Sequence, residues 1–424
     1  PSGEDNRALR RELHDKYGFR PMAASLFASE AFYMHLLLRM GDSYERLLPA
    51  PETSKADLKR EIEASLKRMV PGFLKTVGLH VPEQPPPRNP RMRRRRPRGP
   101  QYRTLQRKLE ETYNVERVDL KSGRVPGNVD TLLLVRPENL DDKQRYAVDQ
   151  FLMRGGAVIA CVGRYSLEPV PGVGLAAKKI DSKLGDLLEA WGIEVEEELV
   201  LDPQNEKLSV PHERQVMGLR VQEIVDINYP FWVDIRKDGM AEASPMLAGL
   251  PSITLQWPSP LELKDLKGVS HTVLLRSSSK AWTQTDTDIR PDFGAFPDKG
   301  FGPGKDAKLE SQILAVAATG TFTSAFKGKA SPLVKGAGAR TDTKDKDSKG
   351  GKVDKSAGTI ESSPDSARVV VIGSGDFVRD QVLFMSRRSG TDRYINNLRF
   401  LHNSVDWSVA DEDLLSIRAR GSYA

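Results

Sequence analysis

Two apolar runs of the sequence end in polar residues that could bind a ligand. The runs AVIACVG (157–163) and RVVVIG (368–373) have the length and composition of buried β-strands. Ligands of open α/β sheets bind at the carboxyl ends of the strands. We therefore predict a ligand-binding group made of Gly163, Arg164, Tyr165, Ser374 and Asp376. A carbohydrate or lipid-linked glycan is one hypothesis for its ligand; the alternative is that the Gly-Ser-Gly sequence only forms a tight turn.

The only cysteine, Cys161, lies inside the first of these runs. Amidotransferase-like α/β proteins place a nucleophile in this neighbourhood, so a cysteine enzyme is a further hypothesis. A thiol becomes reactive beside a base or a helix N-terminus, and the sequence identifies neither. We favour the interpretation that Cys161 is a small apolar residue of a buried strand. One cysteine can form neither an internal disulfide nor an all-cysteine zinc site.

Other motifs for catalysis, metals or nucleotides are not found in the sequence. It has no Gly-x-Ser-x-Gly elbow and no His-Glu-x-x-His pair, and its six histidines are scattered. The stretch GFGPGKD (300–306) superficially resembles a phosphate loop. Lys299 and Asp306, however, occupy the positions at which a Walker A motif needs glycine and Ser or Thr. We therefore expect no catalytic residues, no metal and no cofactor.

The positive charge is concentrated in one segment rich in proline and arginine. The net charge is +6, and residues 88–98 contain seven arginines and no acidic residue. Nucleic-acid binding needs basic side chains spread over a folded face, so we expect no nucleic-acid partner. The run could instead contact an anionic surface such as lipid head groups, or remain solvated. Its central residues are Arg93, Arg94, Arg95 and Arg96.

The elements that must position these residues alternate between strands and helices from residue 76 onward. Helix 141–154 begins with two aspartates and ends before two glycines, as the helix dipole and the glycine stop require. Such alternation, with nearly all-apolar strands, predicts a doubly wound, mostly parallel α/β sheet with amidotransferase- or flavodoxin-like layers. The predicted strands are 76–81, 115–120, 131–137, 157–163 and 368–377, and the predicted helices include 101–113, 141–154 and a segment capped by Asp181.

The domain prediction has two parts. Residues 1–75 are predicted to form an α+β subdomain, in which a hairpin turning at 40–43 is followed by a helix with an apolar stripe, as in half of a thioredoxin-like fold. Residues 76–424 are predicted to form the α/β domain. Its irregular parts are a flexible loop at 82–100, a β-rich elaboration at 208–305 and a disordered insertion at 327–367.

Length and composition exclude several classes of protein. A chain of 424 residues with 38% hydrophobic and 29% charged residues is globular, not fibrous. No run reaches 18 uninterrupted apolar residues, and the first residues lack the apolar core of a signal peptide. We therefore expect no membrane crossing within the sequence given and no unprocessed secretory precursor.

Several separated blocks of the sequence resemble one family. The blocks are AVDQFLMRGGAVIACV (147–162), YPFWVDIRKDGM (229–240), SPMLAGLPSITLQWPSPLEL (244–263), ARVVVIGSGDFVRDQ (367–381) and NNLRFLHNSVDWSVADEDLLSIRAR (396–420). Together they are similar to the GldG-type auxiliary proteins of bacterial ABC-2 transporters, which are linked to gliding motility. The resemblance covers most of residues 17–420.

This resemblance implies a non-catalytic role outside the cytoplasm. It implies a domain on the periplasmic side of the bacterial inner membrane, tethered by membrane helices outside the sequence given. The implied partners are the ABC permease and ATPase subunits of the same system and an exported polysaccharide or lipid. The family's α/β region is also similar to a domain of intraflagellar transport proteins, an association with assemblies and not with catalysis.

Overall fold

The computed structural model describes most of the chain beyond residue 100 and shorter parts before it. The described residues are 22–23, 31–32, 36–40, 43–47, 55, 58, 62, 74–82, 101–170, 174–216, 219–297, 299–329, 331–333, 359–388 and 393–409. The chain divides into two compact units, one of Pro1–Lys75 with Glu110–Asn114 and one of Thr76–Leu109 with Val115–Ala424. None of the described helices is both long and apolar enough to cross a membrane.

The first unit contains two small antiparallel pairs among its described residues. β1 (Met22–Ala23) pairs with β2 (Ala31–Phe32), and β3 (Leu36–Met40) pairs with β4 (Ser43–Leu47). The second pair is the hairpin predicted at 40–43. Most of the predicted helix lies outside the described residues, so the thioredoxin-like half fold stays a prediction.

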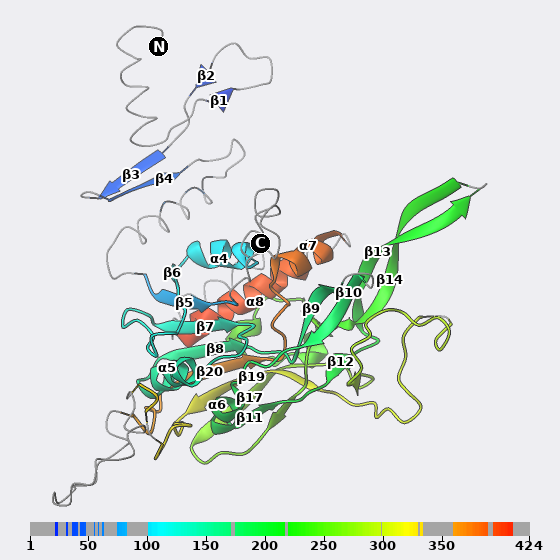
Figure 1. The fold of residues 1–424 in the computed structure, drawn as a ribbon. Coiled ribbons are helices and arrows are strands. Elements are labelled where there is room, and N and C mark those ends of the chain that lie inside the picture. Colours follow the sequence, from blue (N-terminus) through cyan, green and yellow to red (C-terminus); the bar gives the residue numbers. More distant parts are fainter. Residues whose placement is uncertain are drawn as a thin grey trace, which may run out of the picture. The chain divides into compact units, whose positions relative to one another are not determined.

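A nine-stranded mixed sheet organises the described part of the second unit (Figure 1). Its spatial order is β11 (Ile193–Val195), β16 (Leu261–Leu263), β19 (Ile313–Gly320), β20 (Arg368–Ile372), β8 (Ala157–Cys161), β7 (Thr131–Val135), β5 (Thr76–His80) and β6 (Asn114–Arg117), with β17 (Val269–Arg276) also paired to β19. The pairs β5–β7, β7–β8 and β8–β20 are parallel, and the pairs beyond β20 are antiparallel. The predicted α/β fold with parallel central strands is therefore confirmed.

Helices cover both faces of this sheet. α5 (Asp142–Met153) and α6 (Gly185–Ala190) share a hydrophobic core with one face of β7, β8 and β20. α8 (Arg393–Ser408) packs on the other face of β8 and β20, next to α7 (Asp380–Arg388). α4 (Arg103–Glu110) begins beside α7, because the Asp380 carboxylate accepts hydrogen bonds from the first backbone N–H groups of α4 at 2.8 and 2.9 Å.

The helix ends follow local sequence signals, with one exception. Asp141 and Gln144 cap α5 reciprocally, and Gly155, with φ +93°, ends it as predicted. The predicted cap of the next helix is wrong, since α6 begins at Gly185 and Asp181 does not touch it. Asp181 instead accepts a hydrogen bond from the backbone N–H of Lys183, which has φ +62°. α6 begins two residues after this left-handed residue.

A β-rich region, which begins before the predicted elaboration 208–305 and overlaps it, packs on α7 through a core rich in aromatic residues. It contains β9 (Tyr165–Val170), β10 (Gly174–Lys179), β12 (Leu199–Leu201), β13 (Asn205–Val216), β14 (Leu219–Arg236), β15 (Ser252–Gln256) and β18 (Trp282–Gln284), with short 3-10 turns at Lys237–Gly239 and Pro245–Leu247. β13 and β14 form a long ribbon that extends away from the sheet (Figure 1). Within the predicted elaboration 208–305, residues 221–227 lie in β14 and residues 252–256 form β15, whereas residues 270–276 lie in β17 of the large sheet. The central part of the predicted insertion, 334–358, lies outside the described residues.

Candidate ligand-binding site

The parallel half of the sheet contains a point at which its connections diverge. β5 leads through α4 to β6 on one side, whereas β7, the next strand along the chain, lies on the other side of β5. Loops that leave neighbouring strands in opposite directions open a crevice at the carboxyl ends of those strands, which is where open α/β sheets bind ligands. Across the sheet these strands lie in the order β6, β5, β7, β8 and β20. Numbered by their order along the chain, this is the 2-1-3-4-5 arrangement.

A pocket of about 630 Å³ lies at this point. Apolar side chains from the ends of β5 and β6 and the loop after β7 form part of its wall: Leu79, Val81, Val118 and Leu140. Apart from Pro82, polar or ionisable side chains form the rest: His80, Gln101, Tyr102, Arg117, Asp119, Lys121, Glu138, Asn139 and Gln144. The charges of Arg117 and Lys121 are balanced by those of Asp119 and Glu138. The Gln144 amide is bonded to the Asp141 N–H and the Asp119 carbonyl, which leaves the amides of Gln101 and Asn139 to donate to and accept from a ligand. The lining therefore suits a polar ligand of little net charge.

The backbone around the pocket is strained. Leu120, Arg136 and Asn139 have φ values of 62°, 48° and 50°, and all three follow the carboxyl ends of β6 or β7. They are three of the five non-glycine residues with positive φ among those described. Such conformations cost free energy and concentrate at functional sites. Their position here supports the pocket as a site rather than an accidental hollow.

Contacts with β8 and with Gly375 hold Arg136 in this conformation. Its backbone N–H donates to the carbonyl of Cys161 at 3.0 Å, which anchors the end of β7 to β8. Its side chain lies directly on Gly375, where an added Cβ would come within 2.9 Å of the Arg136 Cβ. Glycine at 375 is therefore needed for Arg136 to take this place.

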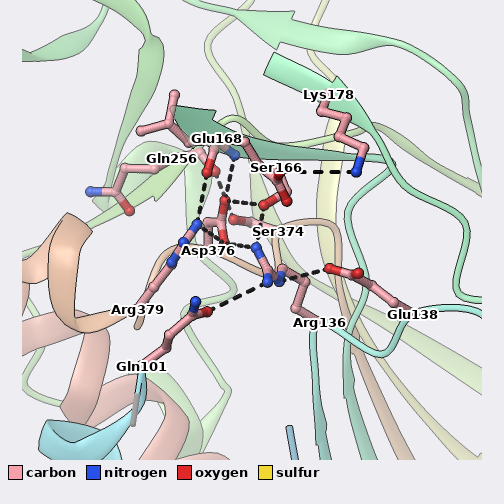
Figure 2. A network of polar contacts seen from close by, with 12 residues as sticks. Gln101, Arg136, Glu138, Ser166, Glu168, Lys178, Gln256, Ser374, Asp376 and Arg379 are labelled. Carbon is pink, nitrogen blue, oxygen red and sulfur yellow. Dashed lines mark hydrogen bonds and ion pairs between the residues drawn. The ribbon is translucent and has the colours of Figure 1, made fainter. Parts of the chain in front are cut away.

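The carboxylate of Asp376 is the centre of a buried polar network (Figure 2). One of its oxygens accepts hydrogen bonds from the Leu167 backbone N–H at 2.8 Å and from the Ser166 hydroxyl at 3.0 Å. The other oxygen lies 3.5 Å from Nη1 of Arg136 and 3.6 Å from Nη1 of Arg379. Both arginine side chains are less than a tenth exposed. Asp376 thus neutralises charge shared by two buried guanidinium groups.

The network reaches the pocket through two residues that line it. Nη2 of Arg136 lies 3.5 Å from Oε1 of Gln101, and its Nε lies 3.2 Å from Oε1 of Glu138. Figure 2 shows both side chains turned toward the guanidinium. Arg136 therefore fixes the two polar walls of the pocket from inside the protein.

Burial and charge shift the pKa values in this region. Burial raises the pKa of Tyr102, and the nearby carboxylate of Asp376 adds to this effect. Burial by itself would lower the pKa of Arg136, but the surrounding groups Tyr102, Asp376 and Glu138 outweigh it, so its pKa is raised. The guanidinium is therefore charged, and the network is an ionic one.

The residues predicted as a ligand-binding group do lie together, one strand further along the sheet. Gly163 packs against the turn of Gly373 to Gly375. The Ser374 hydroxyl, fully buried, donates to the Gln256 carbonyl at 2.7 Å, and the Tyr165 hydroxyl donates to the Glu197 carbonyl at 2.8 Å.

Arg164 is the most exposed member of this predicted group and forms ion pairs with Glu197 and Asp181. The polar atoms of the group are thus bonded within the protein, and ligand binding by these residues stays a prediction. Sequence reasoning missed Gln101, Arg136 and Arg379. The only local signal was the charged Arg136 directly after an all-apolar strand.

Cys161 does not have the surroundings of a nucleophile. Its side chain is completely buried in β8, and burial raises the pKa of its thiol. A protonated, inaccessible thiol cannot attack a substrate. The position supports the interpretation of Cys161 as a small apolar residue of the core.

Two further predictions concern charged groups. The predicted anionic-surface contact of Arg93, Arg94, Arg95 and Arg96 lies outside the described residues. Among the described residues, one group could offer three ligands to a metal, the partly exposed carboxylates of Glu194, Glu196 and Glu262. Nζ of Lys264 lies 2.6 Å from Glu194, so a lysine already supplies positive charge there.

Comparison with known families decides the relationship of the chain. Residues 74–407 match the model of a protein family described as an ABC-type uncharacterized transport system, the ABC transporter auxiliary proteins. The chain belongs to this family. The coarse form of the predicted resemblance is therefore confirmed, and the narrower likeness to GldG-type proteins stays a prediction.

Individual relatives of this auxiliary protein are distant. An uncharacterized protein of Borreliella burgdorferi is 23% identical over 228 residues, which are 52% of this chain and 42% of that protein. The chain thus spans less than half the length of this relative. Among solved structures, an IFT52 N-terminal domain covers 72% of this chain and 93% of its own, with 14% identity and a TM-score of 0.34. A putative ThuA-like protein from Bacteroides uniformis covers 79% and 91%, with 10% identity and a TM-score of 0.33.

Proposed function

We propose that this ABC transporter auxiliary protein is a non-catalytic subunit on the periplasmic side of the bacterial inner membrane. In this role it engages the permease or the exported substrate, while a separate subunit hydrolyses ATP. The family match over 74–407 is the observation that carries the proposal. The narrower GldG-like role in gliding or export, and the membrane tether outside the sequence given, belong to the same proposal.

The geometry of the site supports binding rather than chemistry. The buried charged groups at the carboxyl edge of the sheet are those of Arg136, Asp376 and Arg379, and they face one another. Groups that are neutralised inside the protein cannot exchange protons with a bound molecule without breaking the network. The pocket presents amides and balanced charges to its contents, which suits recognition.

The test is site-specific photo-crosslinking in membranes. A photoreactive amino acid replaces Lys121, which lines the pocket, or Lys267, an exposed residue that does not line it, in the full-length protein. We expect permease or transported material to crosslink at position 121 and much less at 267, and the ATPase subunit to co-purify. Recovery of no transporter subunit, or hydrolysis of ATP by the purified protein, would contradict the proposal.

A carbohydrate or lipid-linked glycan is the second candidate ligand. The observation that favours it is the pair of amide side chains, Gln101 and Asn139, in one pocket, because sugar hydroxyls donate and accept hydrogen bonds as amides do. Glycan-array screening of the Gln101→Ala and Asn139→Gly variants tests it, with Arg164→Ala reporting on the predicted group one strand away; glycine keeps the positive φ of position 139 while removing the amide. Loss of a glycan signal in the first two variants supports the pocket, and loss in the third alone supports the predicted group.

A further inference from the structure

A second pocket, of about 440 Å³, lies at the base of the β13–β14 ribbon and shares no residue with the first. Three segments that are distant in the sequence form it: the ribbon base with Asn205, Asn228 and Pro230, the strand β18 with Trp282, and the loop with Phe301 and Leu309. The loop contains the glycine-rich stretch 300–306, which does not form a nucleotide motif.

The floor of this pocket is aromatic and firmly packed. Trp282 is 5% exposed, and the Phe301 ring packs edge-on against Tyr229 and Phe231 with centroid distances of 5.5 and 5.7 Å. Leu309, which also lines the pocket, is 51% exposed. A buried tryptophan, a half-buried phenylalanine and an exposed leucine thus give the pocket an apolar lining.

The rim of the same pocket is positively charged. Lys280 and Lys299 both line it, and both are exposed. Neither ammonium group has an ion-pair partner within the described parts of the chain, and no acidic side chain described there lines the pocket. Two cations without an acidic partner among the described residues, beside an apolar floor, complement a ligand with one anionic end and one apolar end.

The remaining polar lining does little to accommodate a peptide backbone. The Asn205 amide donates to the carbonyls of Asp202 and Pro203 at 3.2 and 2.9 Å and accepts from the Tyr229 backbone N–H at 2.9 Å. The Asn205 amide is therefore committed to the protein, and Pro230 has no N–H to offer, so Asn228 supplies the one amide of this lining that is left to pair with a backbone. A bound peptide would leave most of its own N–H and C=O groups without partners, at a cost in free energy, whereas an alkyl chain has no such groups.

We propose that this second pocket binds an anionic amphiphile, an alkyl or isoprenoid chain that ends in a carboxylate or phosphate. The chain lies on Trp282, Phe301 and Leu309, and the head group lies between Lys280 and Lys299. The proposal rests on the pocket alone and is independent of the function proposed above.

Isothermal titration calorimetry of the full 424-residue chain tests it. The probes are dodecanoate, dodecyl phosphate and the neutral dodecanol, each below its aggregation concentration. We expect saturable binding of both anions, weakened about tenfold or more in the Lys280→Gln/Lys299→Gln variant, with the affinity for dodecanol unchanged. Leu309→Asp, at an exposed position that does not risk folding, should weaken all three probes.

The matched control is Lys267→Gln/Lys305→Gln, which removes two exposed lysines outside the pocket and should leave all three affinities unchanged. Lysine-dependent binding to phosphatidylglycerol vesicles would assign the source to a membrane lipid, and binding of dissolved amphiphile alone would assign it to a free acid or phosphate. Absence of saturable anion binding, or equal weakening by the control, overturns the proposal. Binding of a peptide ending in Phe-Leu carboxylate without either alkyl anion overturns it in favour of peptide recognition.

Discussion

Replacement of Asp376 by asparagine should destabilise the second unit strongly. Asp376→Asn keeps the shape of the side chain but removes the charge that faces Arg136 and Arg379 at 3.5 and 3.6 Å. The new side chain has one acceptor oxygen and one NH2 group. Either the NH2 group faces the two arginine donors, or it faces the Leu167 N–H and the hydrogen bond from that N–H is lost. Removing one partner of a buried ion pair costs about 3–5 kcal/mol. Because both distances are long and Glu138 still faces Arg136, we expect the lower end, about 3 kcal/mol.

Urea unfolding followed by tryptophan fluorescence measures this loss. All five tryptophans belong to the second unit, so the signal reports that unit alone. Glu310→Gln, which breaks the exposed ion pair with Lys308, is the matched control and should leave the stability nearly unchanged, because exposed ion pairs contribute little. Adding Arg379→Met to Asp376→Asn should cost less than the sum of the single variants, since it removes one uncompensated charge. A loss below about 1 kcal/mol for Asp376→Asn would refute the ionic account of the network.

Three further predictions concern single residues. Gly375→Ala should cost about 1–3 kcal/mol because the added Cβ displaces Arg136, whereas Gly127→Ala, with no atom within 4 Å of its added Cβ, should be tolerated; equal unfolding midpoints would contradict this. Cys161 should resist iodoacetamide in the folded protein and react in urea, because burial raises the pKa of its thiol; mass spectrometry showing rapid native labelling would disprove the burial argument. Burial also raises the pKa of Asp149 above 3.8, so the stability due to this group is present below that pH and is lost as the pH rises through the folded-state pKa. The stability of Asp149→Asn relative to the native chain should therefore improve from about pH 4 to about pH 7 in urea titrations, and a pH-independent difference would count against it.

The central strands and α5 could be predicted because their signals are local. β7 is an uninterrupted apolar run that is buried on both faces, and α5 carries its own cap and stop in Asp141 and Gly155. The antiparallel half of the sheet could not be predicted in this way. β17 pairs with β19 across the loop that follows β18, and such pairing depends on contacts distant in the sequence. The ribbon could not be predicted from an apolar pattern either, since Glu223 and Asp226 lie on a strand with exposed faces and interrupt that pattern.

The sequence predicted that a binding site lies at the carboxyl ends of strands, but not which strands form it. The rule that ligands bind at the carboxyl ends of strands led to the ends of β8 and β20, where apolar runs meet polar residues. The strand order instead places the crevice between β5 and β7, because the connections that follow these two strands run to opposite sides within the parallel half of the sheet. No local pattern reveals that order, since it depends on β5 having β6 on one side and β7 on the other.

The predicted residues and the pocket are nevertheless parts of one structure. Asp376, chosen for its position after β20, bonds across 240 residues to Arg136, whose guanidinium lies against Gln101 and Glu138 in the pocket wall. A side chain that holds two buried arginines cannot also coordinate a ligand without releasing one of them. Asp376 therefore acts on the pocket through Arg136, and a change at Asp376 should disturb ligand binding only to the extent that it moves the wall that Arg136 supports.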